Sequence, residues 1–158
     1  MQGSPPLPEK CILGVEHDPY IVLDATEYPF IPGGRNLTLR DMARFNETIH
    51  LKGRYNGKQI LPTSVVAKVR ESANKSDFAK AGCAALAGGS YKSQWLINHN
   101  AHGAFNARGI HDQTNYVDPK AEMVIVRLGS NLQTSNVNFD HLFLPAYQAI
   151  AEKLMKAK

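Results

Sequence analysis

The sequence has few cysteines, no long apolar run and no concentration of charge of one sign. Its two cysteines, Cys11 and Cys83, are too few for a disulfide scaffold, and no Cys-x-x-Cys pair points to zinc. No apolar run approaches the ~20 residues of a membrane-spanning helix, and the first ten residues lack the order of a secretory signal. The net charge of +4 comes from scattered basic residues. We therefore expect no membrane partner and no nucleic-acid partner, with the cytoplasm as the default compartment.

The residues that are present suit one folded domain. Of the 158 residues, 43% are apolar and 20% are charged, which argues against disorder. A chain of this length also buries enough surface to form a core. Residues 1–10 hold three prolines and are expected to form an extended arm. Residues 11–158 are expected to form the domain.

Helical patterns dominate residues 38–80. Thr38 can cap a helix that Gly53 can end. One face of this helix carries the apolar residues Leu39, Met42, Phe45 and Ile49. Asn56-Gly57 indicates a turn, and residues 62–64 open a second helix. Residues 72–80 are polar and predict a loop or a short helix.

Strand patterns follow, at residues 91–97, 113–117 and 123–128. Residues 123–126 are apolar without alternation, so this strand should be covered on both sides. The last segment repeats apolar residues at helical spacing, and Pro145 places the start of this helix near residues 142–144. The sequence therefore predicts an α+β fold. Helices come first, and an antiparallel sheet of about three strands is covered by a C-terminal helix.

Several blocks of the chain resemble a known family. Residues 34–45, Gly-Arg-Asn-Leu-Thr-Leu-Arg-Asp-Met-Ala-Arg-Phe, resemble a helix motif of serine hydrolases related to β-lactamases. Residues 109–113, Gly-Ile-His-Asp-Gln, with residues 116–119, Tyr-Val-Asp-Pro, are similar to a block typical of the 6-aminohexanoate-dimer hydrolase and esterase branch. The resemblance implies part of a β-lactamase/transpeptidase-like fold. For the full-length family, it implies amide or ester hydrolysis through an acyl-enzyme, without a cofactor.

The resemblance covers only the C-terminal portion of such a hydrolase. The family's nucleophile is the serine of a Ser-x-x-Lys motif, whose hydroxyl gives its proton to a nearby base. Residues 72–75 spell Ser-x-x-Lys, but they follow the helix block that should come after the nucleophile, so we interpret them as a chance match. No tyrosine is followed by asparagine two residues later, as the family's second motif requires. The chain alone is therefore expected to be inactive.

Residues 107–113 are expected to contain the family's third motif, whose backbone N–H supplies half of the oxyanion hole. One alignment places residues 107–109 at Lys-Thr-Gly and leaves the Ile110 N–H as the donor, and the other places His111 at the lysine position. The candidate oxyanion or pocket residues are Gly109, Ile110, His111 and Gln113. Asp112 stands where this branch usually has glycine. A negative charge there, beside a developing oxyanion, would oppose catalysis.

Trp95 and His111 are the candidate substrate-binding residues. Each also has a structural explanation, as a core tryptophan and as a histidine hydrogen-bonded at a sheet edge. His99, His102 and His111 lack helical spacing and a carboxylate that would complete a metal site. We therefore expect no metal and no other cofactor.

The implied ligand is a small amide or ester. Because the family builds its sheet from both ends of the chain, this portion alone should expose a sheet edge and apolar surface. A separately encoded N-terminal half or a second copy of the chain is expected to cover them. The alternative to a hydrolase portion is a non-catalytic ligand-binding or complementing subunit that retains a pocket.

Overall fold

The computed structural model describes residues 13–30, 33–71, 73–80, 86 and 88–157. The predicted arm at residues 1–10, both cysteines and Ser72 lie outside the described residues. Among the described helices, none is long and apolar enough to cross a membrane.

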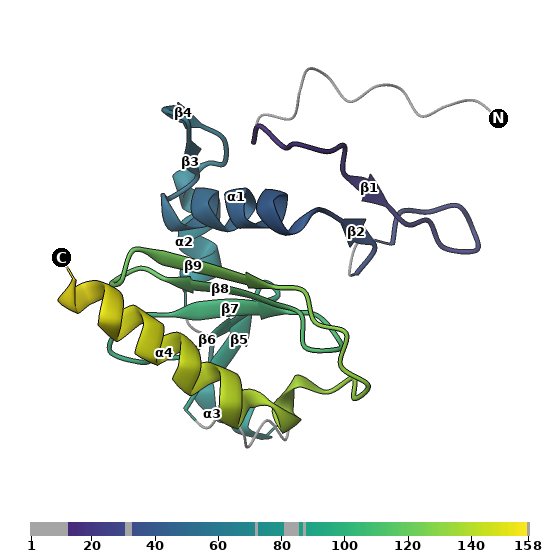
Figure 1. Cartoon of the computed structure of the whole chain (residues 1–158). Coiled ribbons are helices and arrows are strands. Elements are labelled where there is room, and N and C mark those ends of the chain that lie inside the picture. Colours follow the sequence, from purple (N-terminus) through teal and green to yellow (C-terminus); the bar gives the residue numbers. More distant parts are fainter. Residues whose placement is uncertain (1–12, 31–32, 72, 81–85, 87, 158) are drawn as a thin grey trace.

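The first half of the chain forms the predicted helices and two small hairpins (Figure 1). β1 (Tyr20–Ile21) pairs with β2 (Arg35–Asn36), and β3 (Arg54–Tyr55) pairs with β4 (Lys58–Gln59) around the predicted turn. The helices are α1 (Leu39–His50), α2 (Thr63–Arg70) and α3 (Lys75–Lys80). Thr38 caps α1 as predicted, because its hydroxyl oxygen accepts the backbone N–H of Asp41.

Buried Asp41 ties the N-terminal segment to α1. Its carboxylate accepts the backbone N–H of Glu16 at 2.9 Å, the Thr38 hydroxyl at 2.8 Å and Arg44 Nη1 at 2.6 Å. Burial alone would raise the pKa of Asp41, but these donors outweigh it and hold the pKa at about 2. An ionised carboxylate therefore fixes where the chain enters the domain.

The second half of the chain forms one antiparallel sheet in which every strand pairs with its neighbour in sequence. Its five strands are β5 (Ser90–Lys92), β6 (Trp95–Ile97), β7 (Phe105–Arg108), β8 (Thr114–Asp118) and β9 (Met123–Arg127). The α+β class is confirmed. The single strand expected at residues 91–97 is wrong, because the chain turns at Ser93 and Gln94 and forms the β5–β6 hairpin.

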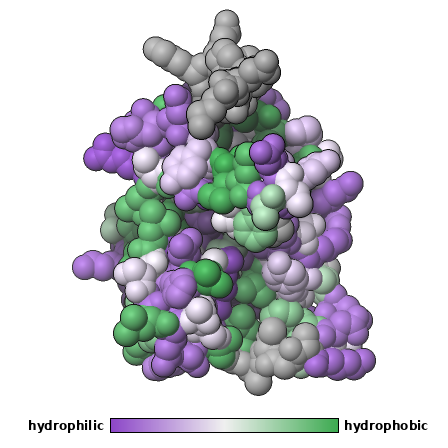
Figure 2. Space-filling model, turned by 90° about the vertical axis from the view of Figure 1, so that its right-hand side faces the viewer, coloured by the Kyte–Doolittle hydropathy of each residue, from purple (hydrophilic) through white to green (hydrophobic). Residues whose placement is uncertain are grey.

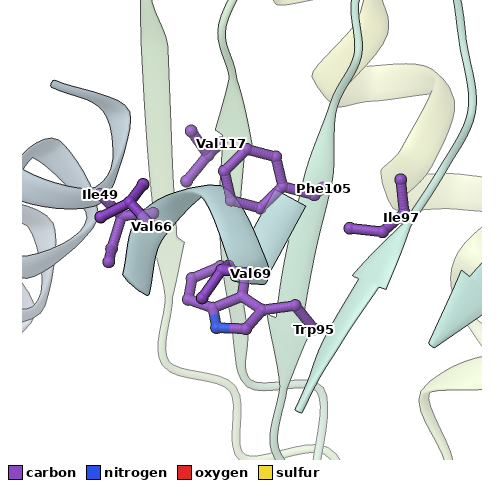
Figure 3. Close-up of a cluster of buried hydrophobic side chains, with 7 residues drawn as sticks. All are labelled: Ile49, Val66, Val69, Trp95, Ile97, Phe105 and Val117. Atoms are coloured by element: carbon purple, nitrogen blue, oxygen red, sulfur yellow. The ribbon is translucent and has the colours of Figure 1, made fainter. Parts of the chain in front are cut away.

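The sheet is covered on both faces, as the apolar run at residues 123–126 predicts (Figure 1). Helices α1 and α2 cover one face, where the buried cluster is Ile49, Val66, Val69, Trp95, Ile97, Phe105 and Val117 (Figure 3). The C-terminal helix α4 (Asp140–Lys156) covers the other face, where the buried cluster is Ala104, Tyr116, Ala121, Met123, Tyr147 and Ala151. In β9, Val124 packs on the first cluster and Ile125 on the second.

The C-terminal helix begins at Asp140, after a 3₁₀ turn at Asn136–Asn138, so the start expected at residues 142–144 is slightly late. Arg108 on β7 explains the earlier start, because its guanidinium lies 2.6 Å from the Asp140 carboxylate in a largely buried ion pair. Pro145 therefore stands at the sixth position of the helix and cannot supply the N–H that would otherwise bond to the His141 carbonyl.

Candidate functional site

The candidate oxyanion residues lie in the loop that joins β7 to β8. The Gly109 N–H donates to the Gln113 carbonyl at 3.0 Å, and the Gln113 N–H donates to the Ile110 carbonyl at 3.4 Å. The Ile110 side chain is 63% exposed. Within the described ranges, the Ile110 N–H meets no hydrogen-bond acceptor. The loop therefore presents one backbone donor, at an exposed position, that the fold leaves free.

His111 and Asp112 both adopt the left-handed backbone region, with φ values of 56° and 74°. The His111 N–H donates to the Thr134 carbonyl at 3.2 Å, and its ring nitrogen Nδ1 lies 2.7 Å from the Asn131 carbonyl oxygen. His111 is therefore held by the segment between β9 and α4. Its ring is engaged with the backbone of this segment.

Asp112 is 3% exposed, and its carboxylate lies 2.6 Å from Arg127 Nη1 at the end of β9. Neither atom reaches hydrogen-bond geometry, so the contact is a close ion pair rather than an aligned hydrogen bond. The Arg127 guanidinium also lies 3.5 Å from the centre of the Phe143 ring. A guanidinium therefore compensates the charge of this buried carboxylate, and its effect on catalysis stays a prediction.

Trp95 lies in the core and not on an open surface. It is 7% exposed, and its ring meets the Phe105 ring edge-on at 5.3 Å (Figure 3). Val69 of α2 belongs to the same cluster. The structure thus gives Trp95 and His111 different surroundings, and their joint role in a substrate pocket stays a prediction.

Two cavities lie elsewhere on the molecule. One, of about 310 Å³, is lined by residues of the β5–β6 region and α4, including Asn98, Asn100 and Gln148. The other, of about 630 Å³, lies between the end of α1 and the β8–β9 turn. Neither is lined by Trp95 or His111. In the part of the chain that the structure describes, no group of three His, Cys, Asp or Glu residues could hold a metal ion.

Two polar pairs that sequence reasoning did not predict lie at the opposite end of the sheet. The Ser90 hydroxyl lies 2.8 Å from His99 Nε2, and His102 Nδ1 lies 2.8 Å from Asp118 Oδ2. Burial, with a smaller effect from Lys75, lowers the pKa of His99. Because Ser90 is fully buried, this hydroxyl is closed to a substrate. The pairing of the strands brings both pairs together, and no spacing of these residues in the sequence predicts them.

Ser72-Ala73-Asn74-Lys75 has a structural explanation in its described residues. The Asn74 side chain accepts the Ser76 N–H at 2.8 Å, which caps the start of α3, and Lys75 is the first residue of that helix. Ser72 itself lies outside the described residues. The described part of this segment therefore forms a helix start.

No protein-family model matches the chain. It is 31% identical over 119 residues to a 6-aminohexanoate-dimer hydrolase from Paenarthrobacter ureafaciens, which covers 75% of this chain and 30% of that protein. Among solved structures it is similar to a "Putative 6-aminohexanoate-dimer hydrolase from Bacillus anthracis", with a TM-score of 0.78 and 40% identity over 92% of this chain and 36% of that chain.

The chain corresponds to a C-terminal portion of a β-lactamase-like hydrolase. The predicted resemblance is thereby confirmed. The chain spans about a third of the length of the relatives it matches. In chemical terms, this hydrolase portion offers a backbone N–H donor on a loop that is tied to the sheet and to the segment before α4.

Proposed function

We propose that these residues form one wall of the active site of a β-lactamase-like serine hydrolase that cleaves a small amide or ester. The observation that carries the proposal is the free Ile110 N–H, on the loop that bears the family-like block, in a chain 40% identical to a structure of that kind. This position favours the alignment that places residues 107–109 at the Lys-Thr-Gly motif.

The proposed role of Ile110 is electrostatic. When a serine hydroxyl attacks the carbonyl carbon of an amide or ester, the carbonyl oxygen gains negative charge in the transition state. A fixed N–H donor stabilises that charge without having to reorganise during the reaction. Gly109 and Gln113 support this donor, because their mutual hydrogen bond closes the base of the loop.

We further propose that these 158 residues do not catalyse the reaction by themselves, since no exposed serine–base pair is found among the described residues. The purified chain should hydrolyse p-nitrophenyl esters at the rate of a heat-denatured sample. A fluorophosphonate probe should leave it unlabelled. Stoichiometric labelling by this probe would contradict the proposal.

The role of Ile110 can be tested in a reconstituted enzyme. The chain is mixed with the portion of the Paenarthrobacter relative that precedes the matched residues, and ester hydrolysis is measured. Ile110→Pro removes the N–H and should lower kcat about 10²- to 10³-fold. Ile110→Ala keeps the N–H and should stay close to the unsubstituted chain. Equal losses in the two variants would contradict the role of the backbone donor.

A complementing role is the second candidate, and the surface of the molecule favours it. Strand β9 lies at an edge of the sheet, and its residues 123–126 carry no charge and no proline of the kind that protects edges. The segment around β1 exposes Tyr20, Val22, Leu23, Tyr28 and Phe30. Figure 2, viewed from the side of this segment, shows hydrophobic groups among hydrophilic ones.

We propose that an N-terminal portion of the same kind of hydrolase, rather than a second copy of the chain, covers this edge and segment. Light scattering coupled to size exclusion should then show a 1:1 complex when the two portions are mixed. A clean monomer in the presence of the N-terminal portion would contradict it. A homodimer of the chain alone would favour the second copy as the partner.

A further inference from the structure

We infer that Arg127 is a positioning residue: its ion pair with Asp112 locks a strained turn and thereby fixes the direction of the Ile110 N–H. The inference rests on the proposed function for its catalytic meaning, although the lock itself is a structural claim. Arg127 is the last residue of β9, and sheet pairing places it opposite Thr114, two residues after Asp112.

The turn requires contacts that hold it, because its backbone conformation is energetically unfavourable. His111 and Asp112 are consecutive residues with a side chain and positive φ, a conformation in which Cβ crowds the backbone. Such residues persist where the surrounding structure holds them, and they concentrate at functional sites. Glycine would adopt the same φ without this crowding.

Several contacts hold the turn, and they come from two directions. The segment between β9 and α4 binds the backbone, since the Asp112 N–H donates to Asn136 Oδ1 at 3.1 Å and the His111 N–H donates to the Thr134 carbonyl at 3.2 Å. The sheet binds the side chain, since Arg127 lies 2.6 Å from the Asp112 carboxylate. Ile110 is joined to this turn, because its carbonyl accepts the Gln113 N–H at 3.4 Å and the Gly109 N–H donates to the Gln113 carbonyl at 3.0 Å, so holding the turn also holds the peptide that carries the Ile110 N–H.

The ion pair is the contact that prevents the turn from relaxing. The Asp112 carboxylate is 96% buried, and a buried charge without a partner is strongly unfavourable. The guanidinium also lies 3.5 Å from the centre of the Phe143 ring of α4, and this contact limits its movement. As long as Arg127 stays in place, Asp112 is held at a φ that its side chain otherwise disfavours.

The experiment measures the residual dipolar coupling of the Ile110 N–H in the isolated chain, because this coupling reports the direction of the bond relative to the sheet. In the unsubstituted chain, the Ile110 coupling should fit the same alignment as the couplings of β7 and β8. Arg127→Met should average it toward zero. Arg44→Met is the matched control, because Arg44 also lies 2.6 Å from a buried aspartate and is 24% exposed, against 27% for Arg127. It should leave the coupling unchanged.

Two double variants test whether the ion pair holds the backbone of the turn or only compensates charge. Both remove the Asp112 carboxylate together with Arg127, so neither leaves an unpaired buried charge, and they can be used if Arg127→Met alone fails to fold. Asp112→Ala with Arg127→Met keeps a Cβ at the strained position and should lose the Ile110 coupling. Asp112→Gly with Arg127→Met removes the strain at residue 112, the residue that the ion pair holds, and should restore the coupling. Equal couplings in the two double variants, or an unchanged coupling in Arg127→Met, would overturn the inference. These outcomes are independent of enzyme activity, so a failure of the proposed function is recognised separately.

Discussion

Replacing Phe105 by alanine tests whether the cluster under α1 and α2 carries the stability of this chain. Phe105 is 1% exposed, its ring meets Trp95 at 5.3 Å, and the Arg70 guanidinium lies 5.8 Å from the ring centre. Truncation of a buried phenylalanine to alanine costs about 3–5 kcal/mol. The lost ring–ring contact accounts for about 0.5–1.5 kcal/mol of this cost. We therefore expect Phe105→Ala to lower the free energy of unfolding by about 4 kcal/mol.

Urea unfolding measures this loss. With a slope of about 2 kcal/mol per molar urea, the midpoint of Phe105→Ala should fall by about 2 M. Trp95, the one tryptophan of the chain, reports unfolding by fluorescence, and far-UV circular dichroism provides a probe that does not depend on the altered ring contact. Tyr91→Ala is the control, because Tyr91 is 52% exposed. A midpoint shift for Phe105→Ala no larger than that of Tyr91→Ala would refute the reasoning.

Three buried or capping groups give further predictions. Burial, aided by the charge of Asp118, raises the pKa of Tyr116 from 10.0 to about 12. Between pH 10 and about 12 the folded state keeps a proton that the unfolded chain has lost, so stability should fall as the pH rises. Thermal unfolding of Tyr116→Phe should not show this fall in stability. The pKa of Asp41 lies at about 2, below its usual 3.8, so the stability it gives is present above pH 3.8 and is lost as the pH falls toward 2. Asp41→Asn should reduce the loss of stability between pH 3.8 and pH 2. An equal loss in this variant would contradict the assignment of that loss to Asp41. Thr38→Ala should lower the unfolding free energy by about 1 kcal/mol in urea titrations, whereas Thr38→Ser should retain it.

Local patterns in the sequence predict the elements whose determinants are themselves local. The cap at Thr38 and the apolar spacing of the next turns predict α1, and Asn56-Gly57 predicts the turn between β3 and β4, where both residues have positive φ. The apolar run at residues 123–126 predicts a strand covered on both faces, because only a doubly buried strand lacks polar alternation.

The elements that sequence reasoning missed depend on partners far along the chain. Ser93 and Gln94 form the tight turn of the β5–β6 hairpin with positive φ values of 51° and 67°, although neither is the asparagine or glycine that signals such a turn. Strand β7 is obscured by Asn106, a fully buried amide that donates to Asn98 Oδ1 at 2.7 Å. A buried polar residue is satisfied there by the residue that follows the neighbouring strand β6, which composition alone cannot reveal.

The candidate site shows the same limit. Its family-like block can be placed at residues 109–113 from the sequence, but the groups that hold it stand farther along the chain, between residues 127 and 136. Arg127 reaches Asp112 because β8 and β9 pair in register, and Asn136 reaches it because the chain returns along the loop before α4. Sequence reasoning therefore identified the Asp112 carboxylate but not the guanidinium that compensates its charge, because Arg127 is not a sequence neighbour.

The sequential pairing of the five strands has a kinetic consequence. Each strand pairs with the strand next to it in the chain, so the sheet forms through short loop closures. Chains dominated by such local contacts fold faster than those that must first join distant segments. The sheet can therefore nucleate from its own hairpins and serve as the template on which α1 and other parts of a hydrolase assemble afterwards.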